Sequence, residues 1–212
     1  MKIVLISDTH EMHEQIVIPR CDILIHAGDL TFRGEEKAVR RALMWLHEQP
    51  AEHVVAIAGN HDWLFEKDPG EAAHLVSQTR IIYLENAATE IDGLSIWGSP
   101  VTPAFMNWAF NCDQANISKY WDQIPTGTDL LITHGPPRGI LDQTDPSRES
   151  QHFGCFDLLE AITRVRPKIH VFGHIHGGNR GMGELRGETT FYNASVVNEA
   201  YAVVNLPFVI DI

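Results

Sequence analysis

Short apolar runs alternate with longer amphipathic segments along the chain. Several of the apolar runs are continuous and rich in β-branched residues, which is typical of strands buried on both faces of a sheet. Strands are predicted at 2–7, 23–26, 54–57, 90–97, 129–133 and 169–172, with later candidates at 190–193 and 200–205. Amphipathic segments predict helices at 34–49, 70–78, 116–123 and 155–165. This alternation predicts a layered α/β fold.

No repeat, low-complexity run or linker interrupts the pattern, and 212 residues fit one domain. We therefore expect a single domain over residues 1–212. Hydrophobic residues make up 44% of the chain, enough to bury a sizeable core. The closing segment carries no helical signal, so its strands are expected to pair antiparallel at one end of a sheet.

Polar residues of a few types follow the predicted strands at their carboxyl ends. They are Asp8-Thr9-His10, Gly28-Asp29, Gly59-Asn60-His61-Asp62, Thr133-His134 and Gly173-His174-Ile175-His176. In open α/β sheets, ligand sites lie outside the carboxyl ends of strands, so we expect these segments to converge on one crevice. Side chains two residues apart on a strand share a face, so Asp8 and His10 are expected to reach one ion.

The donor groups in these segments are carboxylate, imidazole and amide, without a thiolate. Such a set favours Mn, Fe, Co, Ni or Zn over a closed zinc–sulfur site. Seven or eight ligands exceed what one such ion holds. The pattern therefore predicts two divalent or trivalent metal ions that share a carboxylate.

Composition narrows the possible functions. A net charge of −12 argues against a protein that coats nucleic acid or binds an anionic membrane, because both need a basic face. A small anionic substrate stays possible, since bound cations reverse the local field. Cys21, Cys112 and Cys155 are too few and too widely spaced for a disulfide framework. With only four apolar residues after Lys2, we expect free thiols in a cytoplasmic protein without a membrane span.

The five polar segments, in this order, resemble the motifs of the calcineurin-like metallophosphoesterases, and the resemblance extends from residue 1 to about 193. Four further segments resemble a branch of small metallophosphoesterase-domain phosphodiesterases, near the class III cyclic-nucleotide phosphodiesterases. These are Gly98-Ser99-Pro100, Trp108-Ala109-Phe110-Asn111, Thr133-His134-Gly135-Pro136-Pro137 and Asn193-Ala194-Ser195. The resemblance implies a four-layer α/β/β/α sandwich with a dinuclear metal site.

The resemblance also implies a role for each motif residue. One ion would bind Asp8, His10, Asp29 and His176, and the second would bind Asp29, Asn60, His134 and His174. His61 would act outside the metals as a general acid near the leaving group, and Asp62 would orient it. All these positions hold the residue type that the family uses, so a degenerate enzyme is not indicated.

The activity implied is a metal-dependent phosphodiesterase. Its substrates would be small, such as 2′,3′- or 3′,5′-cyclic nucleotides or aryl phosphodiesters, attacked by a hydroxide that the two ions activate. Ser/Thr protein phosphatases differ, since they have Arg at the position of Ala58 and Asp at that of Phe32. A phosphomonoesterase, a nuclease and a non-catalytic metal-bound scaffold are the alternatives.

Several residues outside the metal motifs are candidates for substrate contact. Phe32 and Arg33 follow the bridging carboxylate, and Trp108 and Phe110 are placed to stack on a base. His26 is expected to be a hydrogen-bonded core residue. The remaining histidines are expected at the surface or on helix faces, namely His13, His47, His53, His74, His152 and His170. Homodimers are the commonest assemblies, so a homodimer is the default expectation.

Overall fold

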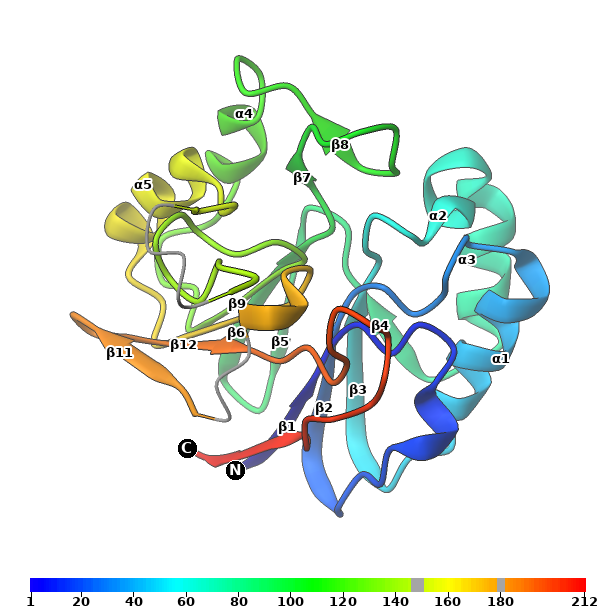
Figure 1. Ribbon diagram of the computed structural model, residues 1–212. Helices are drawn as coiled ribbons and strands as arrows, with labels where there is room; N and C mark the ends of the chain where they lie inside the picture. Colours follow the sequence, from blue (N-terminus) through cyan, green and yellow to red (C-terminus); the bar gives the residue numbers. More distant parts are fainter. Residues whose placement is uncertain (146–150, 179–181) are drawn as a thin grey trace.

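Two β-sheets form the centre of the computed structural model, which describes residues 1–145, 151–178 and 182–212 (Figure 1). The first sheet has the order β13-β1-β2-β3-β4. Its parallel strands are β1 (Lys2–Ile6), β2 (Cys21–Ala27), β3 (Ala51–Ile57) and β4 (Ile81–Tyr83). Strand β13 (Phe208–Asp211) pairs antiparallel with β1, so the two ends of the chain meet.

The second sheet has the order β11-β12-β10-β9-β6-β5. Its parallel strands are β6 (Leu94–Ser99), β9 (Leu130–Thr133), β10 (Ile169–Phe172) and β12 (Thr189–Asn193). Antiparallel strands close both edges, β5 (Ala87–Ile91) and β11 (Glu184–Arg186). A short pair, β7 (Thr102–Pro103) and β8 (Asn111–Cys112), stands at the top of Figure 1.

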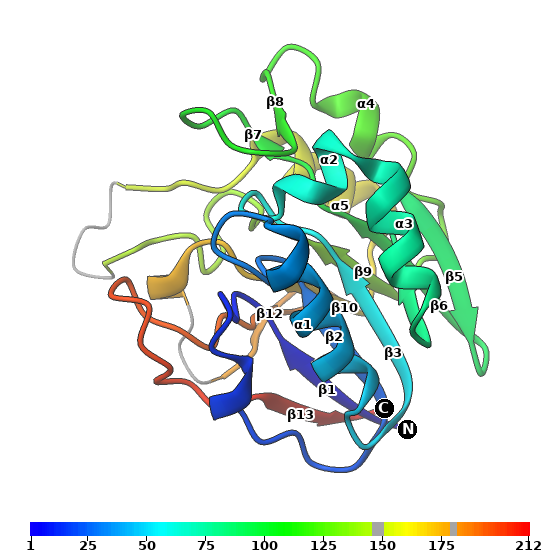
Figure 2. The same ribbon diagram turned by 90° about the vertical axis from the view of Figure 1, so that its right-hand side faces the viewer.

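Helices cover the outer face of each sheet. Helices α1 (Glu36–His47), α2 (Trp63–Lys67) and α3 (Pro69–Ser77) lie on the side of the first sheet that faces the viewer in Figure 2. Helices α4 (Ser118–Trp121) and α5 (Phe156–Val165) lie on the second sheet. Two 3-10 turns, η1 (His13–Gln15) and η2 (His176–Gly178), complete the elements. The predicted four-layer α/β/β/α sandwich is confirmed.

Three buried apolar clusters separate the four layers. The middle cluster lies between the sheets and contains Leu5, Ile25, Ile132 and Val171. The outer clusters pack each sheet against its helices, with Val4, Leu24, Val39 and Leu43 in one and Leu131, Leu158, Ile162 and Phe172 in the other. Successive residues of β1 and β2 therefore enter different clusters, which explains why their apolar runs are continuous rather than alternating.

Two predicted strands are wrong. Segment 90–97 is a hairpin of β5 and β6, because Asp92 and Gly93 both adopt positive φ (50° and 81°) and reverse the chain. Segment 200–205 is irregular, with Tyr201 at φ 58°. An isolated antiparallel β-bridge pairs its Val203 with Val197. The predicted antiparallel pairing of the closing segment is instead made by β13.

Other features of the chain agree with the sequence. Cys21, Cys112 and Cys155 are free thiols. Within the described ranges, no helix has the length and apolarity needed to cross a bilayer.

Candidate metal centre

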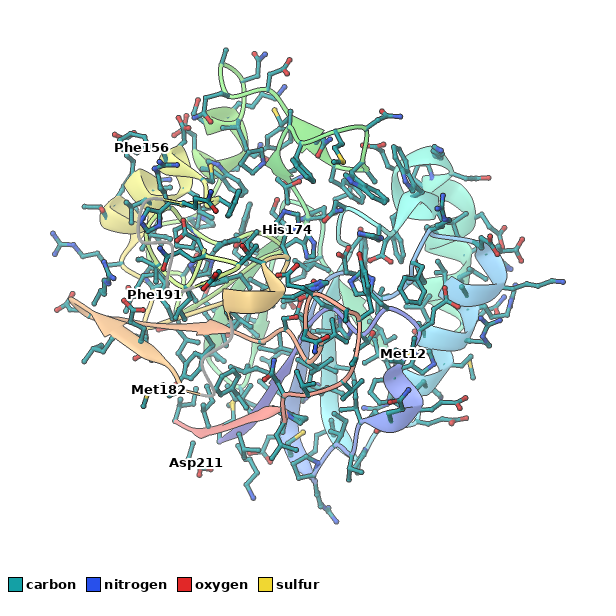
Figure 3. All side chains as sticks on the ribbon, viewed as in Figure 1. Met12, Phe156, His174, Met182, Phe191 and Asp211 are labelled. Carbon is teal, nitrogen blue, oxygen red and sulfur yellow. The ribbon has the colours of Figure 1, made fainter. Side chains whose placement is uncertain are left out.

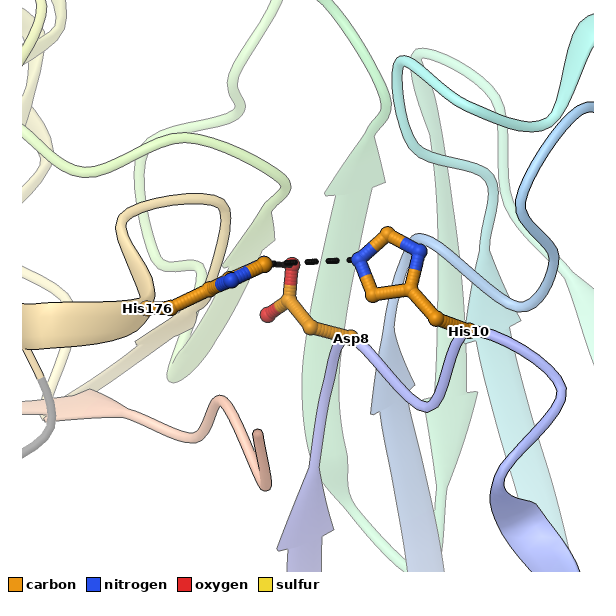
Figure 4. Close-up of side chains that lie close together, drawn as sticks. All are labelled: Asp8, His10 and His176. Carbon is orange, nitrogen blue, oxygen red and sulfur yellow. Dashed lines mark hydrogen bonds and ion pairs between the residues drawn. The ribbon is translucent and has the colours of Figure 1, made fainter. Parts of the chain in front are cut away.

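The five polar segments meet where the carboxyl edges of the two sheets come together. They follow β1, β2 and β3 of the first sheet and β9 and β10 of the second. Three sets of side chains have potential ligand atoms within 4.8 Å of one another: Asp8, His10 and His176; Asp29, His134 and His174; and His10, Asp29 and His61. In Figure 4, His10 points across Asp8 toward His176, and Figure 3 places His174 at the middle of the molecule.

The imidazole rings are oriented by backbone carbonyl groups. Nδ1 of His10 lies 3.1 Å from the Thr31 carbonyl, and Nδ1 of His134 lies 2.9 Å from that of Ala27. Nδ1 of His176 lies 3.2 Å from the carbonyl of Asn198. A carbonyl can only accept, so each Nδ1 is the donor and Nε2 is the nitrogen that faces the centre. Metal-ligating histidines are held in this way.

Asp29 lies between the first two sets of ligands. Its Oδ2 is 3.5 Å from Nε2 of His10 and 3.3 Å from Nε2 of His134. Its Oδ1 accepts the backbone N–H of His61 at 2.9 Å, which fixes the plane of the carboxylate. Asn60 completes this side, because its Oδ1 is 2.9 Å from Nε2 of His134. This position between two sets is the one that a bridging carboxylate requires.

The carboxylate of Asp8 links the two sheets. Both of its oxygens accept the backbone N–H of His174, at 3.0 and 3.1 Å, and Oδ1 lies 3.6 Å from Nε2 of His176. Asp8 and His10 do come together, but not through strand alternation. Strand β1 ends at Ile6, and the two residues have left-handed backbones, with φ of 56° and 40°.

Left-handed backbone is concentrated at this centre. Asp29 and His174 also have positive φ, at 56° and 65°. Such conformations are costly for residues with a Cβ and are enriched at functional sites. Gly28 (φ 95°) shares the constraint, since a Cβ there would lie 2.6 Å from Nδ1 of His134. The loops are thus shaped to bring carboxylate and imidazole groups together.

Charge is distributed unequally among the donor groups. Burial alone would raise the pKa of Asp8, but its hydrogen bond to His176 and the charge of that ring lower it to about 2. Burial lowers the pKa of His10 and of His174 to about 4, so both rings are neutral at pH 7. His134 differs: against the effect of burial, Asp29 raises its pKa to about 9. A cation beside Asp29 would take the place of that proton.

The donor set fits divalent metal ions. It combines buried carboxylates with imidazoles whose Nε2 atoms converge, and an ionised pair of carboxylates in a buried site needs positive charge nearby. The same chemistry suits Mn, Fe, Co, Ni or Zn. The residues of both expected ligand sets, including Asn60, all lie within the described part of the chain.

Asp62 does not contact the ring of His61, so the predicted orienting role is wrong. Its carboxylate is fully buried and accepts hydrogen bonds from the backbone N–H groups of Leu30, Thr31 and Gly59 and from the Thr31 hydroxyl. Nδ1 of His61 instead lies 2.8 Å from the Phe32 carbonyl. Asp62 therefore ties the loop after β2 to the loop after β3.

A cavity of about 650 Å³ opens directly above the centre. Trp108 lines it and stacks on His61, with ring centroids 4.1 Å apart. Phe32 stacks on His10 at 5.3 Å and offers its carbonyl to His61, but is not part of the cavity lining. Phe110 is buried in the first outer cluster, and Arg33 is exposed away from the lining. Of the four predicted substrate contacts, only Trp108 lines the cavity.

Among the cavity residues that escaped prediction are Tyr201, Glu199 and His152. The ring of Tyr201 covers the centre, 4.9 Å from that of His10 and 5.3 Å from that of His176. No motif marks Tyr201, and its only signal is a lone aromatic residue among small and aliphatic neighbours. His152 was expected to be an incidental surface residue.

Two other histidines also differ from expectation. His13 and His170 are buried, not at the surface. His170 lies on β10 between the rings of Phe172 and Phe191 and contacts the Thr133 hydroxyl at 2.8 Å. His26 is a core residue as predicted, bonded to the Thr9 hydroxyl and to the N–H of Gly28. The glycine-rich segment 177–187 contains β11, and its residues 179–181 lie outside the described part.

Sequence comparison agrees with this centre. Residues 1–178 match the family model of the calcineurin-like phosphoesterases. The chain therefore belongs to the calcineurin-like phosphoesterase family, whose members typically bind divalent metals.

The chain is also similar in sequence to individual proteins. Metallophosphoesterase domain-containing protein 1 of Homo sapiens is 39% identical, and the match covers 100% of this chain and 71% of that protein. UPF0046 protein K07C11.7 of Caenorhabditis elegans is 32% identical, with 99% and 74% covered.

Solved structures show the same fold at low identity. A protein from Thermus thermophilus superposes with a TM-score of 0.61 at 12% identity, covering 91% of this chain and 88% of that one. A structure described as a novel archaeal phosphodiesterase has a TM-score of 0.51 at 14% identity, with 100% and 93% covered.

Proposed function

We propose that this protein is a metal-dependent phosphodiesterase that hydrolyses small phosphodiesters, such as cyclic nucleotides or aryl phosphodiesters. Two metal ions would be held at the centre, one by Asp8, His10, Asp29 and His176 and the other by Asp29, Asn60, His134 and His174. When bound, the ions would acidify a water and neutralise charge on the phosphoryl oxygens.

One observation carries the proposal. Imidazole Nε2 atoms from both sheets converge on Asp29 while backbone carbonyls occupy their Nδ1 atoms. Nε2 of His10 and Nε2 of His176 lie 3.3 Å apart, so a positive charge, either a proton or a metal cation, is needed between them. A metal cation held by both rings would supply it.

His61 is suited to protonate the leaving group. The His10, Asp29 and His61 set also makes it a possible ligand, so its role has to be separated by experiment. Unlike His10 and His134, His61 is only partly buried, and its ring lies at the cavity wall against Trp108. With Nδ1–H donated to the Phe32 carbonyl, the imidazolium form of the ring would carry its second proton on Nε2 and pass it to the departing ester oxygen.

The cavity lining favours a diester over a monoester. A phosphate monoester is a dianion, and proteins usually hold it with Arg or Lys. Among the described residues that line the cavity, none is Lys or Arg. A diester carries a single negative charge, and its second organic group would find apolar walls in Phe105, Trp108 and Tyr201. Rings such as these stack on any nucleobase or aryl group.

Comparison of bis-p-nitrophenyl phosphate with p-nitrophenyl phosphate, with added Mn²⁺, tests the proposal. We expect p-nitrophenol to be released faster from the diester and the activity to be abolished by a chelator. The His74→Ala variant, an exposed position on α3, should retain the full rate. Hydrolysis of the monoester alone would indicate a phosphomonoesterase, and hydrolysis of neither would favour a scaffold.

A further inference from the structure

A second histidine, His152, is built into the wall of the cavity by a buried carboxylate. Asp142 is 1% exposed, and its Oδ1 accepts the Nδ1–H of His152 at 2.7 Å. Its Oδ2 accepts the backbone N–H groups of Gly139 and Gly154, at 2.9 and 3.0 Å. The carboxylate is therefore fixed, and it fixes the plane of the imidazole in turn.

The backbone around His152 is held equally firmly. The N–H of Phe153 donates to the carbonyl of Asp142 at 3.2 Å, and the Arg138 guanidinium donates to the carbonyl of His152 at 3.2 Å. Gly154 passes so close to Pro137 that a Cβ there would collide with its carbonyl. His152 is thus positioned before any ligand arrives, as preorganised binding groups are.

One nitrogen of His152 remains available. The side chain is 31% exposed and lines the same cavity as His61 and His174. Nδ1 is engaged by Asp142, and among the described residues no hydrogen-bond partner of Nε2 is found. A neutral ring whose Nδ1–H binds a carboxylate presents the Nε2 lone pair, which accepts a hydrogen bond.

A structural role alone does not explain this arrangement. The carboxylate of Asp142 can hold Gly139 and Gly154 by itself, and the partly exposed imidazole fills no core position. His152 also belongs to none of the three sets of candidate metal ligands. What remains is an oriented acceptor beside a cavity whose size, about 650 Å³, suits a nucleotide-sized molecule.

We propose that His152 is a specificity-determining residue whose Nε2 accepts a hydrogen bond from a hydroxyl group on the organic part of the substrate. The inference rests on the proposed diesterase function and names its preferred substrate class, hydroxyl-bearing diesters such as ribonucleotides. The apolar walls bind the base or aryl group, and His152 distinguishes a sugar that carries the hydroxyl from one that lacks it. Asp142 acts through His152 as a positioning residue.

Matched substrate pairs test this directly. One pair is 3′,5′-cyclic AMP with its 2′-deoxy counterpart, and the other is 2′,3′-cyclic AMP with its 5′-deoxy counterpart, each differing by one hydroxyl. For at least one pair we expect the wild type to favour the hydroxyl-bearing member by about 3- to 10-fold in kcat/KM, as one neutral hydrogen bond supplies. His152→Ala should abolish this preference through KM, and Asp142→Asn should weaken it.

Three controls distinguish loss of the hydroxyl contact from general damage to the site. Bis-p-nitrophenyl phosphate has no hydroxyl, so His152→Ala should lose less activity on it than on the hydroxyl-bearing member of each pair, with unchanged metal content. His152→Gln retains an acceptor oxygen and should recover part of the preference, and His74→Ala should leave every rate unchanged.

Failure of the inference differs from failure of the function. No hydroxyl preference in the wild type, a preference that survives His152→Ala, or hydrolysis of the aryl diester alone would overturn the role of His152. An equal loss on all substrates in His152→Ala would show a structural role instead. Absence of any diester hydrolysis by the wild type would overturn the proposed function itself.

Discussion

At the scale of single residues, the position of the Asp29 carboxylate depends on Gly59, because only a residue without a side chain fits beside it. A Cβ at Gly59 would collide with Oδ1 and N of Asp29 and lie 2.7 Å from Cε1 of His134. These are backbone or buried groups that cannot swing away. Glycine at position 59 is therefore required for the geometry of the centre, although it is not a ligand.

Gly59→Ala should consequently damage the centre more than the fold. We expect the carboxylate of Asp29 to shift and metal affinity to fall by at least about tenfold, since displacing even a supporting group costs this much. Isothermal titration with Mn²⁺ measures the change. Gly70→Ala in α3 is the matched control, because a Cβ there meets only Asp68 at 3.5 Å, and it should bind metal normally.

His61→Ala separates proton donation from metal binding. If His61 is the general acid, kcat for an alkyl diester should fall by about 10²- to 10⁴-fold while elemental analysis finds the wild-type metal content. The loss should be smaller for a p-nitrophenyl diester, whose leaving group needs little protonation. Loss of metal from the variant would instead make His61 a ligand.

At the scale of elements, the centre depends on the loops that follow strands rather than on the strands. The irregular segment 196–205 shows this most clearly. Its turn at Asn198 supplies the carbonyl that holds Nδ1 of His176, and its Tyr201 ring covers His10. The turn is closed by the Asn198 side chain, whose Oδ1 accepts the N–H groups of Ala200 and Ala202.

Asn198→Ala should loosen this turn without touching any ligand. With the carbonyl less well placed, His176 is less well oriented, and we expect Mn²⁺ affinity to drop by about tenfold. The exposed Asn116→Ala offers a matched substitution of the same residue type and should bind as the wild type does. Unchanged affinity in Asn198→Ala would show that the turn does not support the centre.

The elements that sequence alone predicted are those with a strong periodic signal. Strand β10 matches its predicted range, and the continuous runs of β1 to β3 and β9 were recognised because both of their faces are buried. The hairpin at Asp92 and Gly93 was missed although Asp-Gly is a common hairpin turn, because apolar residues on both sides of it were read as one strand. Short edge strands such as β4 and β13 carry too few residues for a period to show.

The candidate ligands could be predicted because they are tied to strand ends and recur in a known order. The supporting contacts could not, since the carbonyls of Ala27, Thr31 and Asn198 carry no side-chain signature. The same is true of His152, whose partner Asp142 lies ten residues away in an unpatterned loop.

At the scale of the whole molecule, two buried histidines make stability depend on pH. Burial lowers the pKa of His26 and of His170 to about 3. His170 has no partner for Nδ1 among the described residues, so a proton there would be buried without an acceptor. Both rings bind a proton in the unfolded chain near pH 6.5 but not in the folded one.

Stability should therefore be complete above about pH 6.5 and fall as the pH drops from there toward about 3. Each histidine contributes a slope of up to about 1.4 kcal/mol per pH unit. His134 opposes this trend only between about pH 6.5 and 9, because its pKa is raised to about 9. His10 and His174, whose pKa is lowered to about 4, add to the trend, so the comparison of variants is decisive. Urea unfolding in a chelator between pH 7.5 and 5 should show a shallower slope for His170→Gln than for wild type. An identical slope would contradict the assignment, and His74→Ala is the control.

Each of the two sheets contributes residues to the centre, so metal-dependent activity requires both sheets to be correctly folded and packed. Mn²⁺ titrated into the metal-free protein while bis-p-nitrophenyl phosphate hydrolysis is followed is the most direct measurement. A dinuclear centre bridged by Asp29 predicts no activity without metal, a plateau at two equivalents per chain, and loss of both activity and stoichiometry in Asp29→Asn. Hydrolysis by the metal-free protein, or full activity in Asp29→Asn, would contradict it.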